Sequence, residues 1–120
     1  MKISELVAAA QALAALNQCQ MPAKTAYRVA RIIAKATAEL RVYDASRMQL
    51  FGQLGTLDQE LNLWSIKPEN IEQFNKEMAG LMEEEVEFSD LPKIALEALE
   101  KVQITPAHIS ALAPFLEDIT

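Results

Sequence analysis

The sequence predicts a mainly α protein, built on a long antiparallel helical hairpin with additional shorter helices and two or three short β-strands. An apolar repeat of seven residues runs through residues 22–51, and a complementary repeat begins after residue 68. An alanine-rich stretch opens the chain. Because 51% of the 120 residues are hydrophobic and only 3 are glycine, the composition is typical of one ordered domain. We expect a single helical domain over 1–120, with the hairpin at about 22–82 and an acidic helical part at about 83–120.

The first helix is expected over residues 4–16. Ser4 can cap it, and apolar side chains recur at helical spacing from Leu6 to Leu16. The second helix is expected from Pro22 to Phe51, which spans roughly 45 Å at 1.5 Å per residue. Its inward positions repeat every seven residues: Ala26, Ile33, Leu40, Arg47 and Leu54, and three residues later Val29, Ala36, Tyr43 and Leu50.

Glycines and a short apolar run mark the turn after this helix. We expect Gly52 and Gly55 to end the helix, because glycine readily adopts the left-handed cap conformation. A short strand and then a helix beginning near Pro68 are expected from these residues: Leu63, Trp64 and Ile66, and then Ile71, Phe74, Met78 and Leu81. Counting back from the turn places Gly80 near Tyr43. Since a glycine inside a helix costs roughly 1 kcal/mol relative to alanine, we interpret Gly80 as a notch for a bulky ring.

The C-terminal part is expected to hold four short elements. They are a strand over 83–90, a helix over 89–101, a strand over 102–105, and a helix opened by Thr105 and Pro106 that runs through Leu112. Pro114 prevents this last helix from continuing much further.

Charge is divided unevenly along the chain, whose net charge is −6. Residues 21–52 hold six basic and two acidic side chains, whereas residues 56–100 hold twelve acidic and three basic ones. The two regions therefore attract each other, either within one chain or between chains.

Few residues could carry out chemistry. His108 is the only histidine and Cys19 the only cysteine, and the sequence brings no partner near either one. Glu83, Glu84, Glu85 and Glu87 are clustered, but no calcium-binding loop surrounds them, so a solvated charged run is the simpler interpretation. The three glycines match no nucleotide fingerprint. We therefore expect no catalytic residue, no metal, no cofactor and no enzymatic activity.

Four basic residues of the second helix form a stripe at steps of four, three and four: Lys24, Arg28, Arg31 and Lys35. In the seven-residue frame they occupy the positions furthest from the apolar edge, which indicates a solvated face or a docking surface for an acidic partner. Nucleic-acid binding is a weaker alternative, because the whole chain is acidic and the only nearby rings are Tyr27 and Tyr43.

Arg47 occupies an inward position, where an unpaired cation is costly. We expect it to pair with Asp44 on its own helix, or with Glu72 or Glu77 on the returning helix, and thereby to fix the register of the hairpin.

Several segments resemble a family of short phage and prophage proteins of uncharacterised function. In order along nearly the whole chain they are "MPAKTAY", Glu39-Leu40 with Tyr43, Arg47 and Leu50, the turn at Gly55, Trp64 and Ile66, Phe74, Glu85-Val86-Glu87 and "ITPAHISAL". The resemblance implies a bacterial host and a viral or prophage gene, with no established catalytic residue to carry across.

We expect a non-enzymatic protein–protein interaction or assembly protein, whose partner is another protein or a second copy of the chain. Ile32 and Val42 are expected as exposed apolar flanks. The alternative is a nucleic-acid-associated regulator, which either grips DNA through the basic stripe or imitates DNA with its acidic residues 69–100. No stretch approaches the roughly 18 apolar residues of a membrane span. A lone cysteine favours a reducing compartment, so we expect the cytoplasm of the bacterial host and no membrane partner.

Overall fold

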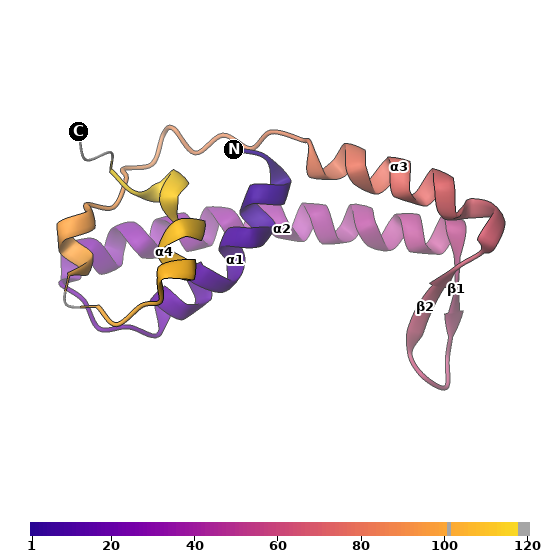
Figure 1. Ribbon diagram of the computed structural model, residues 1–120, viewed down its shortest axis with the longest axis horizontal. Helices are drawn as coiled ribbons and strands as arrows, with labels where there is room; N and C mark the ends of the chain where they lie inside the picture. The colour runs from indigo at the N-terminus through magenta and orange to yellow at the C-terminus, as the bar shows by residue number, and fades with distance from the viewer. Residues whose placement is uncertain (101, 118–120) are drawn as a thin grey trace.

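The computed structural model describes residues 1–100 and 102–117. Its elements in order are α1 (Ile3–Asn17), α2 (Ala23–Leu54), β1 (Gly55–Asp58), β2 (Leu63–Ile66), the 3-10 turn η1 (Pro68–Asn70), α3 (Ile71–Met82), the 3-10 turn η2 (Leu96–Leu99), α4 (Pro106–Ala111) and the 3-10 turn η3 (Ala113–Phe115). Figure 1 shows this arrangement. The predicted fold class, mainly α with a long hairpin and short strands, is confirmed.

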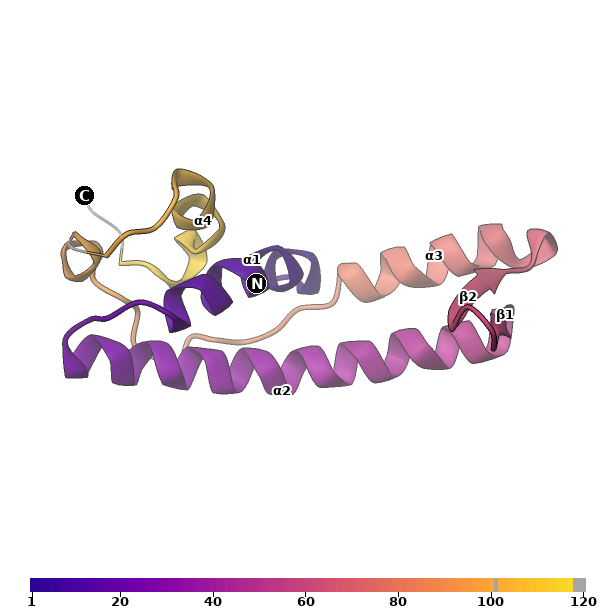
Figure 2. The ribbon, with the colours of Figure 1, turned by 90° about the horizontal axis from the view of Figure 1, so that it is seen from below.

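Helix α2 is the longest element, and α1, α3 and the two strands contact it. The chain returns through β1 and β2 into α3, which runs antiparallel to the C-terminal half of α2 (Figure 1). Helix α1 lies over the N-terminal half of α2, and α4 packs on α1 (Figure 2). The seven-residue repeat of α2 is therefore covered by two different partners in turn, and α3 is too short to cover all of it.

The core lies around the N-terminal half of α2. It combines one face of α1 with residues of α2 and of the C-terminal part: Ile3, Leu6, Ala9, Ala12, Leu13, Leu16, Val29, Ile32, Ala36, Val86, Ile94, Leu99, Leu112 and Phe115. Ile32 is fully buried, so the expectation that it forms an exposed flank is wrong. The reason is that α2 is covered here both by α1 and by the chain after α3, residues 83–100 and 102–117, which we call the C-terminal segment; together they widen its buried face. Val42 is 64% exposed, as expected.

The turn after α2 is a β-hairpin. Gly52 lies inside the helix, and Gly55 is extended with φ −123°, so the expected left-handed glycine cap is wrong. Strand β1 pairs with β2 in antiparallel register, with Leu57 opposite Trp64. A Cβ atom at Gly55 would lie 2.8 Å from the backbone oxygen of Ser65, so the close pairing of the strands requires glycine at this position.

The C-terminal part is less regular than expected. The helix predicted over 89–101 is absent from the described residues, where only η2 is helical, and Lys101 lies outside them. Tertiary hydrogen bonds hold the backbone here: the Ile94 N–H donates to Phe115 O at 2.8 Å, and the Glu117 N–H donates to Ile94 O at 2.8 Å.

The two strands expected in this part are also wrong. Residues 83–90 contribute only a single bridge, between Glu85 and Lys2, and residues 102–105 are irregular. The last helix is confirmed as α4, and the Thr105 hydroxyl caps it by accepting a hydrogen bond from the His108 N–H.

Candidate interaction surfaces

The basic stripe of α2 divides into two outward and two inward-leaning side chains. Lys24 and Arg31 are exposed, and the Arg31 guanidinium lies 6.0 Å from the centre of the Tyr27 ring. Arg28 and Lys35 are half-buried against the C-terminal segment. The stripe is therefore the flank of α2 that faces this segment, and it is not the outermost face that the seven-residue frame predicted.

Both inward-leaning cations bind within the chain. The Arg28 side chain donates to Lys93 O at 3.4 Å. The Lys35 ammonium pairs with Asp90 at 2.9 Å and lies 5.2 Å from the centre of the Phe88 ring. The Lys35 hydrogen bond also holds the pKa of the Asp90 carboxyl below its usual value. Part of the attraction between the basic and acidic regions is therefore satisfied internally.

Arg47 pairs with Asp44, at 3.4 Å and on the same helix. Its guanidinium lies 5.9 Å from the centre of the Phe51 ring, and its Nε is buried without a hydrogen-bond partner. Within the described residues no ion pair joins it to Glu72 or Glu77. The expected pair with Asp44 is therefore confirmed, and because it lies within one helix it does not itself align the two helices of the hairpin.

Three aromatic rings pack together where the C-terminal end of α2 meets the hairpin and α3. Phe51 of α2 stacks on Trp64 of β2 with ring centres 5.8 Å apart, and it packs on Phe74 of α3 at 5.3 Å. The Asn70 side chain donates to Leu54 O at 3.1 Å, which ties η1 to the end of α2. Phe51 thus links the hairpin, through Trp64, and α3, through Phe74, to α2.

Tyr43 and Gly80 are not arranged as the sequence indicated. Tyr43 is half-buried and packs against the core cluster. A Cβ atom on Gly80 would meet no atom within 4 Å. The interpretation of Gly80 as a notch for a ring is therefore wrong, because its helix position faces open space.

Large exposed apolar side chains gather on the hairpin end and along α2. At the hairpin end they are Leu57, Leu61, Leu63 and Ile71, and along α2 they are Tyr27, Val42 and Met48. The hairpin projects from the helices (Figure 1), and hydrogen bonds hold its turn. The Asp58 carboxylate accepts from the N–H groups of Glu60 and Leu61, and Asn62 adopts a left-handed φ of 53°.

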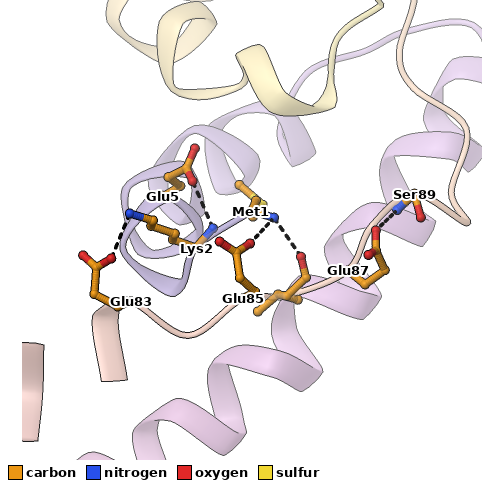
Figure 3. A network of polar contacts seen from close by, with 8 residues as sticks. Met1, Lys2, Glu5, Glu83, Glu85, Glu87 and Ser89 are labelled. Carbon is orange, nitrogen blue, oxygen red and sulfur yellow. Dashed lines mark hydrogen bonds and ion pairs between the residues drawn. The ribbon is translucent and has the colours of Figure 1, made fainter. Parts of the chain in front are cut away.

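The start of α1 is bound to the acidic run 83–87. The amino group of Met1 donates to Val86 O at 2.9 Å and pairs with Glu85 at 3.2 Å, while Lys2 pairs with Glu83 at 2.8 Å (Figure 3). The bond from Glu83 raises the pKa of the Lys2 amine above its usual value. Two of the four clustered carboxylates therefore neutralise cations of this chain.

The remaining carboxylates of this run do not converge on a common point. Glu87 accepts a hydrogen bond from the Ser89 N–H (Figure 3), and bonds from Ser89 lower the pKa of Glu87. No group of three or more histidine, cysteine, aspartate or glutamate residues in the described parts of the chain is arranged to hold a metal ion.

One open cavity of about 420 Å³ lies between α2 and the C-terminal segment. Its apolar wall includes Ile32, Leu91 and Phe115, and the rings of Phe88 and Phe115 meet edge to face at 5.2 Å. Glu87, Ser89 and Lys93 contribute the polar atoms, and all three are exposed. No buried polar side chain in the described residues points into it, so it provides no anchored binding group.

His108 and Cys19 form no reactive pair. His108 lies half-buried on α4, and the Cys19 thiol donates to the backbone oxygens of Ala15 at 3.4 Å and Gln103 at 3.8 Å. Among the residues that the structure describes, no helix is both long enough and apolar enough to cross a membrane.

Comparison of the chain with protein-family models, with curated proteins and with solved structures gave no match.

Proposed function

We propose that this chain is a non-enzymatic interaction protein that binds another protein through its hairpin end. The observation that carries the proposal is the group of exposed side chains Leu57, Leu61 and Leu63 on a hairpin that projects from the helices (Figure 1). Leu61 and Leu63 are 66% and 62% exposed. By the strand register Leu57 lies on the Trp64 face of the hairpin and Leu63 on the opposite face, so apolar side chains are exposed on both faces. Exposed apolar side chains on a projecting element are typical of protein-binding sites.

The backbone of the hairpin supports the same proposal. The sheet has two strands, so one edge of each strand has no partner within the described chain. An isolated two-stranded sheet is marginally stable by itself, and here the Phe51–Trp64 stack fixes its base. A fixed hairpin with open edges can bind an extended segment of another protein through backbone hydrogen bonds.

Charge favours a protein partner over nucleic acid. Asp58 and Glu60 lie beside the exposed leucines and would repel phosphate groups. Of the basic stripe, Arg28 and Lys35 are bound to the C-terminal segment. Imitation of DNA by the acidic residues is also disfavoured, because Glu83, Glu85 and Asp90 pair with cations of this chain.

The resemblance to short phage and prophage proteins extends this proposal. It implies a partner in the cytoplasm of a bacterial host, in agreement with the single cysteine. The position of the gene tests this part: we expect it among phage genes that encode assembly proteins, whereas a place beside transcription regulators would favour the nucleic-acid alternative.

A photo-crosslinking amino acid placed at Leu61 tests the binding site. The full chain is expressed in its host cell, and the matched control carries the same group at Glu97, which is exposed on the opposite end of the molecule. We expect a discrete protein adduct from position 61 that is lost when Leu57 and Leu63 are both changed to serine. No adduct from position 61, or the same adduct from position 97, would refute the proposal.

A further inference from the structure

One side of α2 is uncovered along its whole length. In Figure 2 helices α1, α3 and α4 all lie on one side of α2, and the opposite side meets no other element of the described chain. Nine exposed residues at steps of three or four form this side, which we call the outer row: Ala23, Tyr27, Ala30, Ala34, Ala38, Arg41, Ala45, Met48 and Gly52. Arg41 is the only charged residue among these nine.

The outer row has the composition of a helix–helix contact. Tyr27 and Met48 are 65% and 45% exposed, and Val42 lies at the edge of the row. Gly52 costs roughly 1 kcal/mol relative to alanine inside a helix. The fold of one chain does not require this glycine, because a Cβ atom there would meet nothing within 4 Å. Small residues at such spacing allow a second helix to approach closely.

We propose that the outer row is a self-association surface, on which α2 of a second copy packs antiparallel to α2 of the first. This rests on the proposed function, because it assigns a partner to an interaction protein, but it uses a different surface from the hairpin. The partner is a second copy because eight of the nine positions pair with one another when the row is reversed about its centre, between residues 37 and 38, and the ninth, Ala38, lies at that centre opposite Thr37.

The pairing of the two copies follows from the residue numbers. With that centre, residue 27 lies opposite residue 48 of the second copy, residue 30 opposite 45, residue 34 opposite 41, and residue 23 opposite 52. Each Tyr27 then meets a Met48, a favourable contact of sulfur with an aromatic ring. Each Arg41 meets the small Ala34, Ala30 meets Ala45, Ala23 meets Gly52, and Ala38 lies opposite Thr37 at the centre.

Charge selects the antiparallel orientation. Lys24, Arg28 and Arg31 all lie in the N-terminal half of α2, so parallel pairing would gather the cations of both copies at one end. Antiparallel pairing separates them by the length of the helix. It also brings each basic half to the same end of the dimer as Asp58 and Glu60 of the other copy, and it opposes the two helix dipoles.

Disulfide cross-linking tests the orientation, with Cys19→Ala as the background so that only introduced thiols react. Ala38→Cys is expected to cross-link with itself. Ala30→Cys is expected to cross-link with Ala45→Cys when the two variants are mixed, and neither with itself, because residues 30 and 45 are about 22 Å apart along one helix. Ala79→Cys, exposed on α3, is the matched control and is expected to stay unlinked. Self-linking of Ala30→Cys would show parallel pairing and overturn the proposal.

Charge variants test the same contact without a covalent bond. Ala38→Glu places two carboxylates against each other at the centre, so we expect the dimer dissociation constant to rise roughly 100-fold or more. Ala34→Glu places its carboxylate opposite Arg41, so dimers are expected to persist. Light scattering measures the mass, and circular dichroism checks that both variants remain helical. A monomeric wild-type chain, or equal effects of the two variants, would overturn the proposal, while the hairpin adduct would remain as the separate test of the proposed function.

Discussion

The two halves of α2 are packed very differently. Around its N-terminal half, helices α1 and α4 and the C-terminal segment build a continuous core, in which Leu6, Leu16, Ile32 and Leu112 are fully buried. Around its C-terminal half, helix α3 has no buried residue, and Leu54 is the buried side chain that lies outside the core cluster. One half of the molecule therefore supplies stability, and the other presents apolar side chains to solvent.

The difference in packing between the two halves explains why apolar side chains can be exposed at the hairpin end. The stability of a domain depends on buried apolar surface, so exposed leucines on the hairpin are tolerated only because the other half supplies the core. The hairpin end is held by the three rings of Phe51, Trp64 and Phe74. We expect local opening there at a lower free energy than global unfolding.

The largest expected effect comes from the core half. Leu6→Ala removes a fully buried side chain, so we expect the free energy of unfolding to fall by about 2–5 kcal/mol. Leu61→Ala is the matched control, and because Leu61 is exposed we expect a change within about 0.5 kcal/mol. Chemical denaturation measures both. Equal losses for the two variants would remove the distinction between the halves.

Phe51→Ala is expected to loosen the hairpin half alone. It deletes the ring that contacts both Trp64 and Phe74, at a local cost of roughly 2 kcal/mol. Hydrogen exchange should accelerate in α3 and the hairpin and stay unchanged in α1. Gln53→Ala, at an exposed site nearby, serves as the control. Faster exchange in α1 as well would show that the two halves unfold as one unit.

The glycines of the hairpin half should respond in opposite directions. Gly80→Ala adds a methyl group in open space on a helix, so we expect the free energy of unfolding to rise by roughly 0.5–1 kcal/mol. Gly55→Ala should lower it, because the new Cβ atom would lie 2.8 Å from the Ser65 oxygen. Thermal denaturation compares the two variants, and a destabilised Gly80→Ala would restore a packing role for Gly80.

The smallest effect concerns the ion pair between Lys35 and Asp90. The pKa of Asp90 is lowered in the folded chain, so its contribution to stability is present above the unfolded pKa and is lost as pH falls through the folded pKa. Asp90→Asn should therefore be slightly less stable than the wild type at pH 7, with the difference vanishing in acid near pH 2. Glu97→Gln, an exposed carboxylate of the same segment, is the control. Denaturation at both pH values measures the difference, and a difference unchanged in acid would contradict the role of the pair.

The helical elements with strong periodicity could be predicted from the sequence, whereas the C-terminal part could not. The apolar spacing of residues 4–16 and 22–51 predicts α1 and α2 closely, and Thr105 with Pro106 predicts α4. Residues 89–101 have helix-forming composition, but the described backbone there pairs with Phe115 and Glu117. Short segments adopt the contacts that tertiary packing offers them, which their own pattern does not contain.

The candidate surfaces, too, could be predicted from the sequence only in part. The sequence indicated the basic stripe, but not that Arg28 and Lys35 would lean on the C-terminal segment. The outer row consists mostly of small residues at helical spacing, yet only the fold shows that no described element covers it.

The amino-acid sequence by itself determined that the chain is mainly α, that α2 is its longest helix and that charge is divided along it, because these properties depend on local spacing and composition. The tertiary structure decided which face of α2 is buried at each point, which cations are paired, and that the chain between α2 and α3 forms an exposed β-hairpin. These depend on contacts between residues far apart in the chain, such as Ile32 with the core around α1, and no local pattern specifies them.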